Sequence, residues 1–143
     1  MKDINFNLEI SYSQIGIFLV NLDDPFNEWN ENHIAQGFSW RKESVCFGTL
    51  SNEGQCRIVV GIRDKLTYNQ QATRVIVVPF VVEENGIEVA SITEGIEILI
   101  PKGNYEIVFS ARAAKNNEDT DSYEIFFVKK SNPSARIIIA DEE

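Results

Sequence analysis

Two apolar, β-branched runs flank the dipeptide Asn85-Gly86 within the stretch from Arg74 to Thr93, and this pattern constrains the fold more than any other. Asn-Gly between such runs is a strong signal for a hairpin with a type I′ turn, because both central residues of that turn need a positive φ. The hairpin would place Val82 opposite Val89. Its alternate residues form two apolar faces: Val78, Phe80, Val82, Ile87 and Val89 on one, and Val77, Val81, Ala90 and Ile92 on the other. We therefore expect the hairpin inside a sheet that is covered on both faces.

Other segments with alternating or continuous apolar residues predict further strands. They are 7–12, 15–20, 38–50 (a strand pair or one bent strand), 56–62, 96–100, 105–112, 123–128 and 136–140. A helix is expected only within 21–37, where Asp24 or Asn27 can cap its start and Gly37 its end. The alternative for this short, asparagine-rich segment is a single turn followed by a loop. Pro79 cannot donate a ladder hydrogen bond, so we expect a bulge or a one-sided edge there.

The chain has 143 residues, of which 43% are hydrophobic and 24% charged, a composition that supports one domain with a buried core. Many short strands separated by turn signals, with at most one helix, are typical of two packed sheets. The sequence therefore predicts an all-β fold, a single-domain antiparallel β-sandwich over residues 1–143 with at most one short helix.

The two cysteines flank the turn candidate Ser51 to Gly54. A turn centred on residues 52 and 53 pairs Cys46 with Val59 and not with Cys56, so we expect two reduced, buried cysteines. No apolar run approaches the ~20 residues of a membrane helix, and the first residues carry no hydrophobic signal-peptide segment. These features predict a cytoplasmic protein without membrane insertion, brought to the membrane only through a partner.

Catalytic and cofactor motifs are missing from the sequence. His33 is the only histidine, it lies in an asparagine-rich segment, and no nucleophile motif is near it. One histidine cannot complete a histidine-based zinc site, and the glycines are too scattered for a phosphate-binding loop. We expect a protein that is not an enzyme and has no cofactor, catalytic residue or metal site. The alternative is a calcium-dependent, ligand-binding β-sandwich that uses a late acidic loop containing Glu118, Asp119, Asp121 and Glu124.

The chain is acidic, with a formal net charge of -9 that is concentrated in its second part. Up to Val82 there are 9 acidic and 7 basic residues, and from Glu83 on there are 13 acidic and 6 basic ones. Solubility is the plain explanation of this excess. A sharper one is a basic partner, such as an enzyme that acts on nucleic acid. Direct binding of DNA or RNA is not expected, because phosphate binding needs a basic patch.

Several blocks in the sequence together resemble the bacterial competence protein J family, the inhibitors of the DNA-entry nuclease. The blocks span most of the chain: 8–14 (LEISYSQ), Trp29 with Ile34 and 37–38, 78–87 (VPFVVEENGI), 101–105 (PKGNY) and 121–123 (DSY). The resemblance implies a non-enzymatic protein that binds a small DNA nuclease and blocks cleavage. An immunity protein against a nuclease toxin is the close alternative.

The acidic composition independently fits such a role. An acidic protein can fill a basic nuclease cleft by presenting carboxylates where phosphates would lie. We rank three groups of candidate partner-binding residues, each of which is otherwise explained as exposed, solubilising charge. In descending order they are Glu118, Asp119 and Asp121 in the late loop, then Glu83, Glu84 and Glu88 at the expected hairpin tip, then Asp23 and Asp24.

Overall fold

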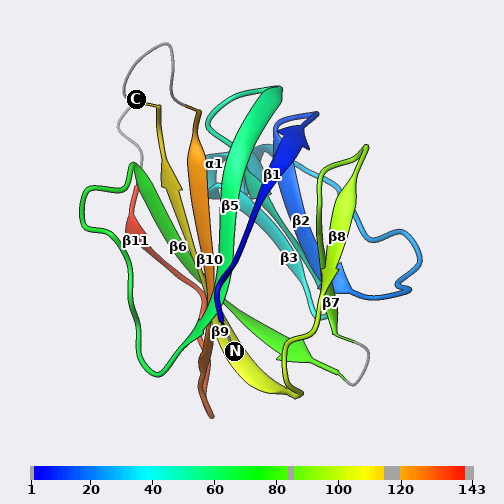
Figure 1. Ribbon diagram of the computed structural model, residues 1–143, viewed down its shortest axis with the longest axis vertical. Coiled ribbons are helices and arrows are strands. Elements are labelled where there is room, and N and C mark those ends of the chain that lie inside the picture. The colour runs from blue at the N-terminus through cyan, green and yellow to red at the C-terminus, as the bar shows by residue number, and fades with distance from the viewer. Residues whose placement is uncertain (1, 84–85, 115–119, 141–143) are drawn as a thin grey trace.

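Two β-sheets packed face to face form the body of the protein (Figure 1). The computed structural model describes residues 2–83, 86–114 and 120–140. The six-stranded sheet has the order β1-β5-β10-β9-β6-β11, and the five-stranded sheet has the order β3-β4-β2-β7-β8. The strands are β1 (Ile4–Ile10), β2 (Gln14–Leu19), β3 (Phe38–Arg41), β4 (Ser44–Gly48), β5 (Gly54–Arg63), β6 (Arg74–Val82), β7 (Ile87–Ala90), β8 (Gly95–Ile98), β9 (Gly103–Arg112), β10 (Ser122–Lys129) and β11 (Arg136–Ile139). The predicted β-sandwich is confirmed, with one short helix, α1 (Glu31–Gln36).

Strand direction departs from the prediction at one place. β10 pairs with β5 in parallel, whereas the other paired strands of both sheets run antiparallel. The long connection from β5 to β6 allows β9 and β10 to be added later in the chain, so that β10 takes the place beside β5. None of the helices in the described residues is long and apolar enough to cross a membrane.

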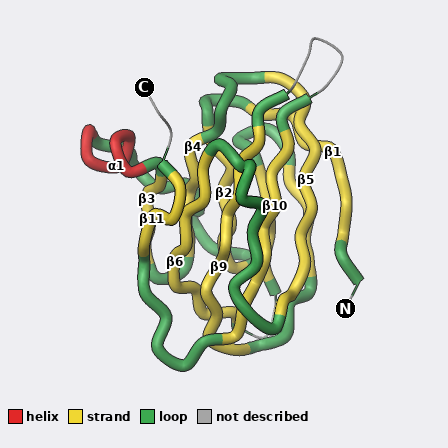
Figure 2. The backbone as a smooth tube through the Cα atoms, turned by 90° about the vertical axis from the view of Figure 1, so that its left-hand side faces the viewer, coloured by secondary structure: helices red, strands yellow, loops and turns green. Residues whose placement is uncertain are grey.

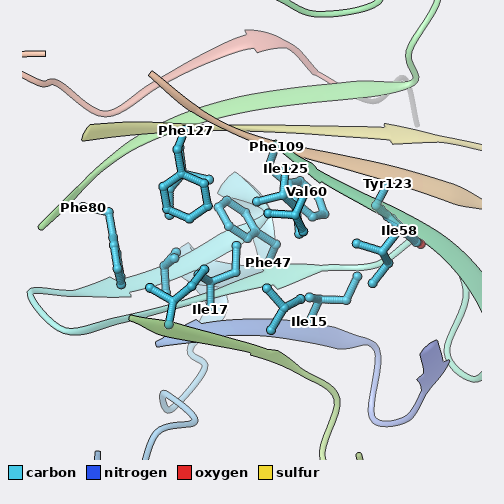
Figure 3. Close-up of a cluster of buried hydrophobic side chains, with 14 of the residues drawn as sticks. Ile15, Ile17, Phe47, Ile58, Val60, Phe80, Phe109, Tyr123, Ile125 and Phe127 are labelled. Atoms are coloured by element: carbon cyan, nitrogen blue, oxygen red, sulfur yellow. The ribbon is translucent and has the colours of Figure 1, made fainter. Parts of the chain in front are cut away.

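The core lies between the two sheets and is built from their inward-facing residues. Phe47 of the five-stranded sheet stacks on Phe109 of the six-stranded sheet, with ring centroids 4.2 Å apart and planes 1° apart. Phe109 in turn stacks on Tyr123 at 5.5 Å. Figure 3 shows such side chains pointing toward one another from the two layers. A smaller cluster, which includes Tyr68 and Ala72 of the β5–β6 connection, covers the outer face of the six-stranded sheet.

The predicted hairpin around Asn85-Gly86 is wrong. β6 belongs to the six-stranded sheet and β7 to the five-stranded sheet, so the chain crosses between the layers instead of turning back. Gly86 does have the predicted positive φ, at 80°, whereas Asn85 lies outside the described residues. The one-sided edge at Pro79 is confirmed, because β11 pairs with β6 only from Val75 to Val77 and leaves Pro79 with β9 alone.

The segment between β4 and β5 crosses between the sheets in the same way, so Cys46 does not pair with Val59. Both cysteines are nevertheless free and buried, as predicted. Burial raises the pKa of the Cys56 thiol to about 12.

Helix α1 begins later than either predicted cap. Asn30 is the N-cap, and its Oδ1 accepts a hydrogen bond from His33 N at 3.0 Å while His33 Nδ1 accepts one from Asn30 N at 3.2 Å. Asp24 has a φ of 49°, and the Asn27 amide instead donates to two backbone carbonyls of the five-stranded sheet. Gly37 ends the helix with a φ of 90°, as expected. Figure 2 shows the helix at one edge of the sandwich, outside both sheets.

Candidate partner-binding surface

The outer face of β7 and β8 carries two carboxylates directly opposite each other. Glu88 and Glu97 are Cα partners in the antiparallel pair, and their neighbours Ile87 and Ile98 face the core. A Cβ atom added at Gly95 would lie 2.6 Å from Glu88 Oε2, so the carboxylate of Glu88 lies over this glycine. Burial, followed by the charge of Glu97, raises the pKa of Glu88. Like charges in this position destabilise a strand pair.

No cation in the described part of the chain neutralises this pair. Ion pairs between described residues are Arg63 with Asp3 and Arg136 with Glu106, and neither involves β7 or β8. The Glu88–Glu97 pair therefore presents uncompensated negative charge on the sheet surface.

Three more of the predicted site residues belong to segments that meet at Gly86, beside β7, although Asp24 reaches β3, where Arg41 Nη2 donates to its carbonyl. The loop after β2, which contains Asp23 and Asp24, starts where Val20 N donates to Gly86 O at 3.3 Å. Glu83 is exposed on the segment that leads to the same glycine, and its carbonyl accepts from Gly86 N at 3.3 Å. We call Asp23, Asp24, Glu83, Glu88 and Glu97 together the β7 surface. Glu84 lies outside the described residues.

Asp121, the described member of the late-loop group, lies in contrast at the other end of the sandwich. Asp121 Oδ2 accepts from Ser51 Oγ at 2.6 Å, and its Oδ1 accepts from Ala114 N at 2.8 Å. Residues 51 and 52 adjoin the start of β2, where Ser13 N donates to Asn52 O, whereas Gly86 adjoins its end. Six residues of strand, about 20 Å, separate the two ends. Glu118 and Asp119 lie outside the described residues.

Asp121 is therefore a loop anchor as well as a candidate contact, because both of its carboxylate oxygens already accept hydrogen bonds. Glu124, named with it for calcium, lies on the outer face of the six-stranded sheet, opposite Ser110 of β9. Within the described residues, no group of three or more His, Cys, Asp or Glu side chains is placed to hold a metal ion.

Glu97 was missed in the sequence, although a signal for it was present. The alternation of residues 96–100 places Glu97 on the polar face of its strand. Its position opposite Glu88 follows only once β8 is paired with β7, and the expected β6–β7 hairpin concealed that pairing.

The three aromatic residues close together in sequence separate in the structure. Trp29 donates to Gln14 Oε1 at 3.0 Å, Phe38 is buried, and Trp40 Nε1 donates to Pro79 O at 2.7 Å. Trp40 thus links edge strand β3 of one sheet to β6 of the other, while 43% of it is exposed. The indole N–H thus supplies a hydrogen bond to the Pro79 carbonyl, at the position where β6 lacks a second neighbouring strand.

The fold and this surface can now be compared with known proteins. The family model Competence protein J (ComJ) matches residues 7–128. The chain belongs to this family. The expected resemblance is thus confirmed over most of the described sandwich, from β1 to β10.

Relatives with sequence and structural similarity support the assignment. A protein of Bacillus subtilis (strain 168) named DNA-entry nuclease inhibitor is 28% identical over 118 residues, which are 81% of this chain and 88% of the relative. The crystal structure of ComJ from Bacillus subtilis, described as the inhibitor of the DNA degrading activity of NucA, has a TM-score of 0.78 and 26% identity, with 89% of this chain and 96% of that chain covered. This chain is therefore homologous to a nuclease inhibitor, a non-enzymatic protein.

A second solved structure shares the fold alone. The protein titled Crocagin biosynthetic gene J aligns with a TM-score of 0.59 at 12% identity, covering 90% of this chain and 97% of its own. At this identity the likeness concerns the arrangement of the two sheets and carries no functional argument.

Proposed function

We propose that this protein binds a DNA nuclease and blocks DNA cleavage, with the β7 surface as its principal contact. Homology to the Bacillus subtilis inhibitor supports the activity and the kind of partner. The single observation that supports this surface is the uncompensated Glu88–Glu97 pair. A nuclease binds polyanionic DNA through cationic side chains, and these would relieve the repulsion between the two carboxylates.

Asp23, Asp24 and Glu83 are exposed and add charge of the same sign to the surface. Arg41 is a nearby cation, since its Nη2 donates to Asp24 O. Such a concentration of negative charge speeds association with a basic partner and makes the rate depend on salt. Asp121 is assigned a lesser role, since its carboxylate anchors the β9–β10 loop.

The test is a DNA-cleavage assay with a nuclease encoded beside this gene, in which the protein is titrated at low and at moderate salt. We expect stoichiometric loss of cleavage that needs more protein at higher salt. Glu88→Gln/Glu97→Gln should weaken inhibition by roughly tenfold or more, because close interfacial charge pairs contribute about 1.5 kcal/mol or more. Glu53→Gln, an exposed glutamate at the other end of the sandwich, is the matched control.

Two results would contradict different parts of the proposal. Failure to inhibit at any ratio, with no complex in size-exclusion chromatography, contradicts the inhibitor function. If Glu53→Gln weakens inhibition and Glu88→Gln/Glu97→Gln does not, the β7 surface is not the contact. The contact then lies at the opposite end of the molecule, beside Asp121.

A further inference from the structure

The outer face of the six-stranded sheet carries a cavity whose lining is basic, although the protein as a whole is acidic. The cavity has a volume of about 180 Å³ and lies among β5, β9, β10 and the connection that precedes β6. Its polar lining residues are Arg57, Asn69, Ser110, Arg112, Ser122 and Glu124. It belongs to the opposite sheet from the β7 surface.

Strand register places the two arginines on either side of the cavity. Ser122 of β10 is the Cα partner of Arg57 on one side and of Arg112 on the other. The three residues therefore form one row across adjacent strands, with the two arginine Cα atoms about 10 Å apart. Neither guanidinium forms an ion pair with a described carboxylate. Two unpaired, like-charged side chains flank the same space.

Ser110 supplies a buried hydroxyl that has no partner. It is 3% exposed, it lines the cavity, and its Oγ makes no hydrogen bond among the described residues. A buried polar atom without a partner is costly, which indicates that something binds to it in the working protein. Asn69 lies on the wall opposite the sheet, and its Oδ1 already accepts from Gln71 N, which leaves its amide N–H groups as donors.

We propose that this cavity binds a phosphate oxyanion. Four donor groups line the cavity from different sides, namely two guanidinium groups, the Ser110 hydroxyl and the Asn69 amide. This arrangement suits a tetrahedral ion with several acceptor oxygens, whereas the two oxygens of a carboxylate are satisfied by one guanidinium fork. The ligand that this lining favours is free inorganic phosphate.

Glu124 gives the site a means of selecting among oxyanions. Its carboxylate lines the same cavity as the two arginines, one row along from Ser122. A carboxylate repels a fully deprotonated anion but accepts a hydrogen bond from the P–OH group of hydrogen phosphate. Sulfate has no such proton at neutral pH, and a phosphate monoester, whose second pKa is about 6, has mostly lost its own. The cavity should therefore prefer inorganic phosphate to both.

The test is NMR of the full chain, with backbone amide shifts followed during titration with potassium phosphate against potassium chloride of equal ionic strength. We expect saturable shifts at residues 110–112 and 122–124. Arg57→Gln/Arg112→Gln should abolish them, and Ser110→Ala, which removes one oxygen atom, should weaken binding about tenfold. Lys42→Gln/Lys129→Gln, which removes two exposed charges elsewhere, should leave binding intact.

Further titrations identify the source and the selectivity. We expect saturation by phosphate and weaker binding of adenosine 5′-monophosphate, whereas equal or tighter binding of this monoester at the same amides would contradict the role of Glu124. Glu124→Gln should bring sulfate binding close to phosphate binding. Absence of saturation by both phosphate ligands, or shifts that persist in Arg57→Gln/Arg112→Gln, would overturn the site, and equal binding of sulfate by the unaltered protein would overturn the role of Glu124.

Discussion

Glu106 is the charged side chain that the described fold buries most completely, at 2% exposed. Its Oε2 accepts hydrogen bonds from Arg136 Nη1 at 2.7 Å and from Ser134 N at 3.0 Å, and its Oε1 accepts from Arg136 Nη2 at 3.2 Å. Glu106 is on β9 and Arg136 starts β11, with Pro79 of β6 between them in the sheet. The ion pair therefore holds β11 to the sheet beside Pro79 of β6, which has no N–H to donate to a neighbouring strand.

Arg136→Gln would leave the Glu106 carboxylate buried with one hydrogen bond, from Ser134 N, and with Lys130 as the remaining opposing charge near it. Breaking a buried ion pair from one side costs about 3–5 kcal/mol. The Arg136 side chain is 38% exposed, so water reaches the pair. We therefore expect the lower end, a loss of about 3 kcal/mol in the free energy of unfolding. Glu106→Gln removes the charge but keeps a polar group, and should cost about 1–2 kcal/mol.

The pH dependence of this loss has a definite sign. The hydrogen bonds from Arg136, more than any other cause, lower the pKa of Glu106 in the folded protein. A carboxyl with a lowered folded pKa stabilises the fold above its unfolded pKa, about 4.3, and loses that contribution as the pH falls through the folded value. The difference between the unaltered protein and Arg136→Gln should therefore be full at pH 7 and shrink below about pH 4.

Urea unfolding followed by circular dichroism, repeated from pH 7 downward, measures both quantities. Asp3→Asn is the matched control, because it breaks an ion pair with Arg63 whose side chains are 29% and 36% exposed. Such an exposed pair should contribute at most about 1 kcal/mol. A loss in Arg136→Gln no larger than in Asp3→Asn, or one that stays constant down to pH 3, would refute the reasoning.

Three further predictions concern the rest of the sandwich. Glu88→Gln and Glu97→Gln should each raise the free energy of unfolding at pH 7 by about 0.5 kcal/mol, since each removes the like-charge repulsion across β7 and β8; urea unfolding would show a loss if the pair were stabilising. Gly37→Ala should lower the melting temperature more than Gly54→Ala, because both glycines have a positive φ but only at Gly37 would a Cβ meet a buried isoleucine of β6, at 3.0 Å. The Cys56 thiol should react with Ellman's reagent at neutral pH only as fast as the protein unfolds, since burial raises its pKa to about 12; rapid reaction of the native protein would contradict its burial.

Apolar periodicity alone predicted most of the strands and the inward-facing residues. The alternation of 105–112 places Tyr105, Ile107, Phe109 and Ala111 on one face, and all four are buried in the core between the sheets. The end of the helix was also predictable, because only glycine adopts the φ of 90° at position 37 without cost. Its start was not, because the segment 21–30 offers several capping residues and tertiary contacts fix most of them elsewhere.

The candidate surface was only partly predictable because acidic residues in loops give no sign of which end of the molecule they occupy. Asp23 and Glu83 are far apart in sequence, and the hydrogen bond between Val20 and Gly86 joins the segments that carry them. Asp121 looked like a free loop carboxylate, and its two internal partners, Ser51 and Ala114, become visible only in the fold. Sequence composition supplied the sign of the charge, and topology determined its location.

The hairpin predicted around Asn85-Gly86 was wrong, yet Val82 and Val89, which it assigned to the core, are buried. The reason is that two different arrangements of the chain bury the same residues. A hairpin and a crossing between two packed sheets both need a reversal of chain direction, and both bury alternate residues on either side of it. Val82 and Val89 face the core in either arrangement, as neighbours in one sheet or from opposing sheets. Local periodicity fixes which side of a strand is apolar, but it says nothing about which strand lies beside it. That choice is made by long-range partners, here β9 for β6 and β2 for β7, whose contacts have no signature within the turn itself.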